Sequence, residues 1–149
     1  MKPQWIESFF KYCPKCGTES TDFGVVPYRC RECGFAQFFG PVAAVGGLIC
    51  NAQDQLLLVR RARDPEQGKW GLPGGFVDRN ESIEQALSRE VLEETNLRVV
   101  SSRYLMSHPN QYNYQGMIAP VIDLFFTCQV DPQSVVSLDD GELDDHQWV

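Results

Sequence analysis

The stretch that decides the fold runs from Gly75 to Leu97 and reads GFVDRNESIEQALSREVLEETNL. Three of its glutamates, Glu90, Glu93 and Glu94, fall within little more than one helical turn, and residues three and four apart share a helix face. Three carboxylates on one face repel each other unless a positive charge lies among them. A hard divalent cation meets that need, because Mg²⁺ takes oxygen ligands and shares them with substrate phosphates. The plain alternative is an acidic, solvated helix face.

The same stretch carries the signals of a single helix. Ser82 and Gln85 have the spacing of a capping box, which predicts a helix that begins there and runs to about Thr95. Leu87 and Val91 are four residues apart and predict the face that packs on the core. The glutamates lie mainly on another side of this helix.

The stretch resembles the Nudix box, Gly-x5-Glu-x7-Arg-Glu-U-x-Glu-Glu-x-Gly-U, in which U is a bulky aliphatic residue. The positions that match are Gly75, Glu81, Arg89, Glu90, Val91, Glu93, Glu94 and Leu97. Asn96 stands where the family has glycine. That glycine would be the left-handed residue just past the helix end, and Asn is the next best residue for this conformation. We therefore expect the departure to affect stability more than chemistry.

This resemblance implies an α/β fold, a Nudix α/β/α sandwich with a mixed sheet. It also implies Mg²⁺ (or Mn²⁺) bound by the carbonyl of Gly75 and the carboxylates of Glu90 and Glu94, with Glu93 sharing the metal cluster. A diphosphate is densely anionic. Metal ions neutralise it and lower the pKa of the attacking water, which explains the need for several carboxylates.

The remaining polar residues of the box are expected to support these ligands. Arg89 would complete the catalytic set by holding carboxylates with charge-assisted hydrogen bonds. Glu81 would orient this network or add a metal ligand; otherwise it is a first-turn glutamate favoured by the helix dipole. The general base is either Glu93 or the acidic loop 139–142 (Asp-Asp-Gly-Glu), since an equivalent loop supplies the base in some family members. The plain reading of that loop is a solvated acidic turn.

Four of the six cysteines have the spacing of a zinc site. They form two Cys-x-x-Cys pairs, each followed by glycine, with thirteen residues between the pairs: Cys13, Cys16, Cys30 and Cys33. This pattern predicts tetrahedral Zn²⁺, and a redox pair is the alternative. Cys50 and Cys128 lie in apolar runs and are expected to be buried, unreactive thiols.

The chain divides near Gly40-Pro41. Residues 1–38 are expected to form a zinc ribbon that depends on its metal for folding energy, and residues 41–149 the Nudix domain. Strands are expected at 42–49, 55–61, 98–105 and 121–130, with a last strand starting near His146. Family members usually carry a further helix after this point, so we expect the natural chain to continue past Val149.

A zinc ribbon followed by the Nudix box resembles the NADH pyrophosphatase branch of the family. That branch carries a Ser-Gln-Pro-Trp-Pro-Phe-Pro-x-Ser motif, which residues 107–114 match only at Ser107 and Pro109, with Tyr112 in place of the phenylalanine. Tyr112 and Tyr114 would sandwich an adenine or nicotinamide ring, or they are ordinary edge-strand aromatics.

Two further features bear on the substrate. Arg60 and Arg61 would hold phosphate oxygens, or they are ordinary strand-edge charges. Trp70 is expected in the core, although a base-stacking platform is the other interpretation. His108 is read as a loop residue without metal partners.

Composition limits the partners. The chain has 149 residues, 43% of them hydrophobic, and a net charge of −7, so a nonspecific grip on nucleic acid or an anionic membrane is not expected. The first ten residues lack a signal-peptide core and no segment is long enough to span a bilayer, which predicts a cytoplasmic protein. The aromatic N-terminus, Trp5, Phe9 and Phe10, would suit a homodimer contact.

The sequence therefore predicts a Mg²⁺-dependent hydrolase that splits NADH, NAD or an ADP-ribose-like dinucleotide into two monophosphates. The alternative is a nucleotide-sensing module, or a protein- or RNA-interaction module that uses the zinc ribbon. The complete glutamate set and the negative charge argue against this alternative.

Overall fold

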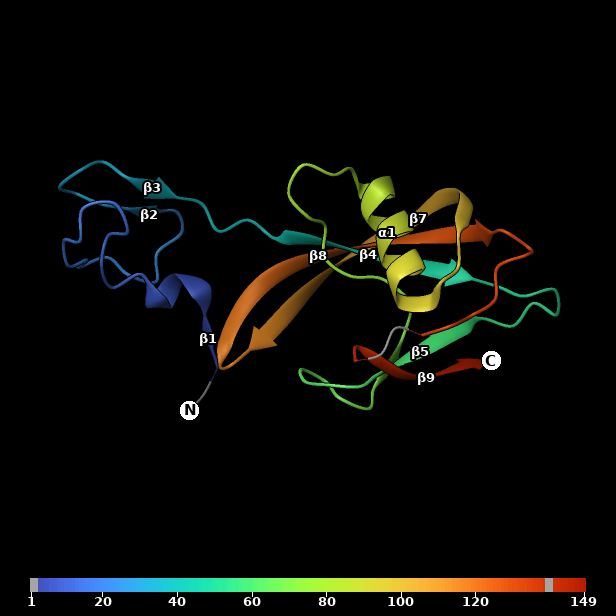
Figure 1. Ribbon diagram of the computed structural model, residues 1–149. Coiled ribbons are helices and arrows are strands. Elements are labelled where there is room, and N and C mark those ends of the chain that lie inside the picture. The colour runs from blue at the N-terminus through green and yellow to red at the C-terminus, as the bar shows by residue number, and fades with distance from the viewer. Residues whose placement is uncertain (1–2, 139–140) are drawn as a thin grey trace. The chain divides into compact units, whose positions relative to one another are not determined.

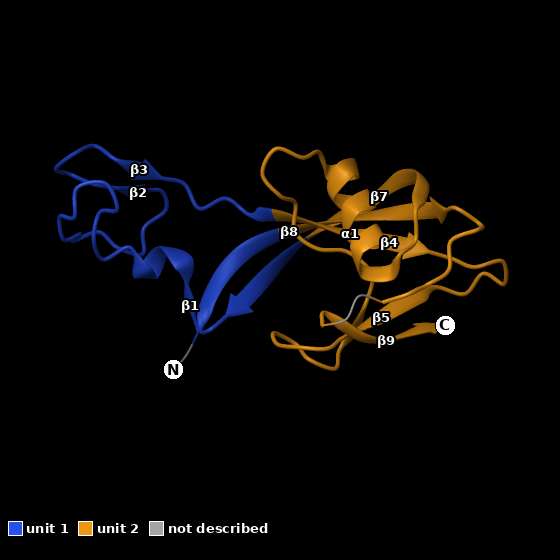
Figure 2. Cartoon of the chain, viewed as in Figure 1, with its two compact units in different colours: residues 1–42, 109–121 blue, residues 43–108, 122–149 orange. Residues whose placement is uncertain are grey.

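The computed structural model describes residues 3–138 and 141–149. The chain forms two compact units, which Figure 2 colours separately: Met1–Val42 with Pro109–Val121, and Ala43–His108 with Ile122–Val149. The predicted α/β class with a mixed sheet is confirmed, because one strand joins its sheet in parallel and the others form antiparallel pairs.

The second unit contains one helix among its described residues and most of the strands (Figure 1). Strand β8 pairs with both β4 and β7, and β5 pairs with β6 and β9 in a separate three-stranded sheet. The bounds are β4 Val42–Ile49, β5 Leu57–Arg61, β6 Trp70–Gly71, α1 Ile83–Thr95, β7 Val99–Tyr114, β8 Met117–Val130 and β9 Leu143–Trp148.

Helix α1 follows the predicted pattern. Ser82 caps its N-terminus in a capping box with Gln85, and Asn96 ends it in the left-handed conformation at φ 59°. Leu87 and Val91 are fully buried, as expected. They pack into one core with side chains of β4, β5 and β8, including Ile49, Leu57 and Phe126, so apolar burial fixes the helix against both sheets.

Strands β7 and β8 extend well beyond the predicted ranges. The two central residues of their turn, Gln115 and Gly116, both have positive φ, which suits the twist of a tight hairpin. The polar run around Pro109 concealed the end of β7, because an edge strand tolerates proline. His108 therefore lies in a strand, not in a loop.

The first unit combines the cysteine-rich segment with the outer end of this hairpin. Its elements are β1 Gln4–Trp5, the 3-10 helix η1 Ile6–Phe9, β2 Tyr28–Arg29 and β3 Ala36–Gln37. Strand β1 lies parallel to β8, with Gln4 opposite Met117. Tyr28 is buried and packs against Phe10 and Phe35.

Two predictions of burial were wrong. Cys50 is exposed, because it directly follows the inward-facing Ile49 and successive strand residues point to opposite faces. Trp70 is 38% exposed and stacks under the guanidinium of Arg60, 5.5 Å from the ring centroid. Among the described residues, no helix is long and apolar enough to cross a membrane.

The left-handed Asn96 predicts a matched pair of stability changes. We expect Asn96→Gly to leave the free energy of unfolding unchanged or raise it by up to about 1 kcal/mol, and Asn96→Val to lower it by about 1–2 kcal/mol. Denaturant unfolding of both variants checks this. Equal stability of the two variants would contradict the conformation of this residue.

Candidate active site

Two glycines bring the segment before α1 against strand β4. The Val45 amide donates to the Gly75 carbonyl and the Gly47 amide to the Pro73 carbonyl, each at 2.8 Å. A Cβ on Gly74 would lie 2.0 Å from the Val45 carbonyl oxygen, and Gly74 has φ +148°. Only glycine fits this approach.

Gly75 lies directly against the carboxylate of Glu90. A Cβ added to Gly75 would come within 2.6 Å of Glu90 Cδ. Because Gly75 has no side chain, the Glu90 carboxylate can lie directly beside its backbone. Two predicted metal ligands from different segments are therefore neighbours in the structure.

Arg89 is the centre of the carboxylate cluster. Its Nη2 and Nε donate to the two oxygens of Glu81 at 2.6 and 3.1 Å, and its Nη1 donates to Glu90 at 2.7 Å and Glu93 at 3.1 Å. The hydrogen bond from Arg89 lowers the pKa of Glu81, and these carboxylates raise the pKa of Arg89. One guanidinium thus offsets the repulsion among three acids.

Glu94 is held near the cluster by a hydrogen bond that does not involve Arg89. Its Oε2 accepts the Gly74 amide at 2.8 Å. Burial raises the pKa of Glu94 to about 7 although that hydrogen bond opposes the shift, and the charges of Glu90 and Glu142 act in the same direction as burial. Burial also raises the pKa of Glu90, against the influence of Arg89.

Glu93 is the least constrained of these acids. Its side chain is 58% exposed, and Arg89 is its recorded partner among the described residues. A carboxylate held by one exposed ion pair can change partners at little cost. Glu93 is therefore free to turn towards a metal ion or a water molecule.

The donor types of the carboxylate cluster suit a hard divalent cation, but the carboxylates do not form a closed cage. Among the described residues, only the four cysteines bring their ligand atoms within 4.8 Å of one another. Glu90, Glu93 and Glu94 offer carboxylate oxygens, and the Gly75 carbonyl keeps a second lone pair beside its bond to Val45. Burial is the main cause of the raised pKa of Glu90 and of Glu94, and the charges of neighbouring glutamates add to it. A cation would offset this negative charge.

The two candidate phosphate-binding arginines, at the end of β5, have different partners. The charge of Arg61 lowers the pKa of Glu94, and its Nε donates to the Pro65 carbonyl at 2.8 Å. Arg60 instead pairs with Asp144 at 2.7 Å and stacks on Trp70. The pairing of β5 with β9 shifts its register between Arg60 and Arg61.

Part of the acidic loop bears on the cluster. Asp139 and Asp140 lie outside the described residues. Glu142 makes an ion pair with Arg63, and its carbonyl accepts the Ala62 amide at 2.8 Å. Sequence analysis missed Arg63, because nothing in the pattern placed it opposite a residue 79 positions later.

The tyrosine pair lies in the first unit. The rings of Tyr112 and Tyr114 are 6.4 Å apart between centroids and almost parallel, at 8°. Two strand residues at i and i+2 share a face, which explains the arrangement.

The four cysteines of the first unit form a preset tetrahedron. The Sγ atoms of Cys13 and Cys33, and those of Cys16 and Cys30, are each 3.7 Å apart, and all four lie within 4.8 Å of one another. Zn–S bonds of about 2.3 Å place tetrahedral sulfurs about 3.8 Å apart. The cluster therefore fits zinc.

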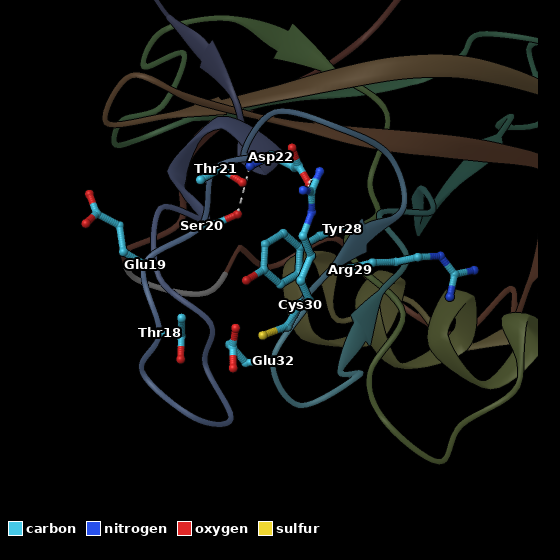
Figure 3. A pocket seen from close by; sticks show the side chains of 10 residues that line it. Thr18, Glu19, Ser20, Thr21, Asp22, Tyr28, Arg29, Cys30 and Glu32 are labelled. Atoms are coloured by element: carbon cyan, nitrogen blue, oxygen red, sulfur yellow. Dashed lines mark hydrogen bonds and ion pairs between the residues drawn. The ribbon is translucent and has the colours of Figure 1, made fainter.

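The two cysteine pairs have different surroundings. The Thr18 hydroxyl, 3.4 Å from Cys16 Sγ, lowers the pKa of Cys16 to about 6. A hollow of about 230 Å³ lies beside the cysteines, with the Tyr28 hydroxyl and the Cys30 sulfur pointing into it (Figure 3). The second pair has Phe35 where Thr18 stands, so it lacks this hydroxyl.

Known proteins resemble this chain over most of its length. A family model described as "NUDIX domain" matches residues 40–149. The NAD-capped RNA hydrolases NudC of Shigella flexneri and of Escherichia coli K12 are 30% identical over 142 residues, covering 93% of this chain and 51% of theirs. This chain thus spans about half the length of the curated relatives it matches.

Solved structures share the fold. A MutT NUDIX hydrolase from Burkholderia pseudomallei superposes with a TM-score of 0.64 at 25% identity, covering 73% of this chain and 82% of that one. The NUDIX domain of Shewanella oneidensis NrtR complexed with ADP ribose gives 0.60 at 25% identity, covering 74% and 73%.

The contact between Gly75 and Glu90 predicts a specific loss of metal binding. We expect Gly75→Ala to displace the Glu90 carboxylate and weaken Mn²⁺ affinity at least tenfold, measured by titration calorimetry. Gly71→Ala is the matched control, because a Cβ there meets no atom within 4 Å. Equal Mn²⁺ affinity in both variants would contradict this geometry.

Glu94 predicts a pH dependence of stability in the metal-free protein. Its pKa is raised from 4.5 to about 7 on folding, so the unfolded chain releases this proton first and stability falls as pH rises between these values. We expect this loss to be on the order of 1 to 3 kcal/mol and to be absent in Glu94→Gln. Denaturant unfolding at pH 5 and pH 8 measures it; identical pH profiles for the two proteins would exclude the shift.

The sulfur tetrahedron predicts one tightly bound zinc. We expect Cys30→Ser to lose it, by elemental analysis, and to abolish the near-ultraviolet signal of buried Tyr28. The far-ultraviolet circular dichroism signal of helix α1 should persist. Cys50→Ser is the control, and zinc retention by Cys30→Ser would refute this ligand set.

Proposed function

Because the chain belongs to the Nudix family, we propose that it is a divalent-metal-dependent hydrolase of a nucleoside diphosphate linked to a second group. NADH, NAD and ADP-ribose-like molecules are the favoured substrates, each giving two monophosphates. The observation that carries this proposal is the cluster of Glu81, Glu90 and Glu93 around Arg89.

Each residue of the cluster has a distinct task in this proposal. Glu90, Glu94 and the Gly75 carbonyl hold Mg²⁺ or Mn²⁺, and Glu93 turns from Arg89 to share it. Glu81 acts through Arg89 as a positioning residue, because both its oxygens are held there. The bound metal supplies charge neutralisation for the diphosphate and a lowered pKa for the attacking water.

Two carboxylates are candidates for the general base. Glu93 is favoured by its exposure and its single exposed ion pair. Glu142 is favoured by the effect of its charge on Glu90 and Glu94, although Arg63 holds its carboxylate. The base receives the proton that the attacking water gives up.

The substrate groups are assigned to the remaining polar and aromatic residues. Arg61 is proposed to bind phosphate oxygens, because its charge acts on Glu94 of the carboxylate cluster. Arg60 can do so only by leaving Asp144. Tyr112 and Tyr114 are proposed to hold a planar ring, since their rings are nearly parallel, at 8°, and their centroids are 6.4 Å apart.

The first unit is proposed to contain a zinc ribbon within residues 1–38, before a Nudix domain at 41–149. Four thiolates at zinc spacing need a reducing compartment such as the cytoplasm. A homodimer through the exposed Trp5 and Phe9 is also proposed.

A second candidate is a substrate whose diphosphate is attached to RNA. The relatives named NAD-capped RNA hydrolases favour it, although the net charge of −7 makes strong RNA binding unfavourable. A sensing module that binds ADP-ribose without cleaving it is the remaining alternative, because one structural neighbour is an NrtR domain bound to that molecule.

The test is a product assay by mass spectrometry. The zinc-loaded protein, with Mg²⁺ or Mn²⁺, is incubated separately with NADH, NAD, ADP-ribose and a short NAD-capped RNA. Glu93→Gln should lower turnover at least a hundredfold. Glu84→Gln, an exposed glutamate on the same helix and outside the cluster, should leave turnover unchanged.

Each outcome has a defined meaning. Release of AMP from NADH, NAD or ADP-ribose supports the dinucleotide substrate, and cleavage of capped RNA alone moves the specificity to the second candidate. Saturable ADP-ribose binding without any product would favour the sensing module. Full activity of Glu93→Gln would remove this residue from the mechanism.

A further inference from the structure

A second hollow lies in the Nudix unit, outside the carboxylate cluster. It measures about 600 Å³ and is lined by the turn after β4, by Leu97 after α1, by the end of β8 with the segment that follows it, and by β9. None of the lining residues belongs to the metal-binding set. This volume lies within the range of small-molecule sites.

The carboxylate cluster meets β4 near its middle, and the hollow lies just past the end of this strand. Val45 of β4 contacts Gly75 at the cluster, whereas Cys50, five residues later, lines the hollow. Five extended residues span about 17 Å. A molecule in the hollow therefore occupies a site separate from the diphosphate.

The walls of the hollow are apolar and aromatic. Leu97, Val130 and Val136 meet the half-buried Trp148 there, and all four also contact the buried core. Leu57 of β5, opposite Trp148, is fully buried. The floor is thus part of a packed core, which keeps the hollow preformed.

The polar groups of the hollow fall into two classes. The side chains of Asn51 and Asp131 already accept backbone amides of their own turns, at 2.9–3.0 Å. The imidazole of His146, the thiol of Cys50 and the indole N–H of Trp148 make no recorded hydrogen bond with other described residues. These three groups remain for a ligand.

The charge of the lining selects the ligand class. It contains no lysine or arginine, and Asp131 is its single carboxylate. A phosphate would enter without a compensating charge, which is costly. An uncharged ring satisfies the apolar walls, can stack on Trp148 and can exchange hydrogen bonds with His146.

We propose that this hollow binds an uncharged heteroaromatic molecule, up to the size of a nucleoside, at a site remote from the metal centre. The exposed Val135, 74% accessible, would be buried by such a ligand. The segment that carries Val135 is tied to α1 by the Ser137 amide, which donates to the Thr95 carbonyl at 3.0 Å. Binding would therefore order this segment against the helix that bears the glutamates.

The test uses nuclear magnetic resonance of the zinc-loaded protein without Mg²⁺ or Mn²⁺. Adenosine and nicotinamide are titrated while the Trp148 indole N–H signal is followed, and AMP serves as the charged counterpart of adenosine. We expect saturable shifts with the uncharged probes, and at least tenfold weaker binding of AMP at Trp148.

Two adjacent turn residues provide matched variants. Ala52 lines the hollow and Gln53 does not, and both are exposed. Ala52→Trp should weaken adenosine binding at least tenfold, and Gln53→Trp should leave it unchanged. Ser134→Trp is a second blocking variant from the opposite wall.

Several results would overturn the proposal. One is the absence of saturable shifts at Trp148 with either uncharged probe. Another is adenosine binding by both blocking variants that is as tight as that of the unmodified protein. A third is a set of shifts confined to residues 90–94. Probe-free shifts of Trp148 that depend on protein concentration would instead assign the hollow to a contact between copies. None of these measurements requires hydrolytic activity, so the test is independent of the proposed reaction.

Discussion

One guanidinium makes the carboxylate cluster possible. Glu81, Glu90 and Glu93 each contact Arg89, whose side chain is itself only 27% exposed. Without that charge, three acids from one helix and the turn before it would repel each other at short range. Arg89 also donates to the Phe76 carbonyl at 3.1 Å, so it ties the helix to the segment that carries Gly75. The same group therefore balances charge and fixes the geometry between two segments.

That geometry depends on backbone contacts as much as on charge. The segment 73–77 makes three backbone hydrogen bonds with β4, at the alternate residues Ala43, Val45 and Gly47, and Gly74 and Gly75 leave no room for a side chain. Glu94 then reaches the Gly74 amide. The acids Glu90 and Glu94 are consequently held in a partly buried place where a proton or a cation is favoured. Burial is thus the main reason why a bare negative charge is unfavourable at this place.

The sequence predicted what local rules determine. The capping box, the left-handed Asn96 and the buried Leu87 and Val91 follow from short-range patterns, and the sulfur tetrahedron follows from cysteine spacing. Contacts between distant residues were missed. Two such contacts depend on how β5 pairs with β9 and β6: the ion pair of Arg63 with Glu142, and the exposed position of Trp70 beside Arg60. Register between strands decides such contacts, and no single segment records it.

The composition of the first unit has a consequence for biosynthesis. All four clustered cysteines lie within the first 33 residues, yet β1 pairs with Met117 and Ile118 of β8. The cysteine cluster can therefore assemble early from local contacts, whereas β1 gains its partner strand only when Met117 has been made, 84 residues after Cys33. Loop closure over such a separation is slow. During translation, the nascent ribbon would hold its zinc with Trp5 unpaired, and a chaperone or a neighbouring chain would have its best access during this interval.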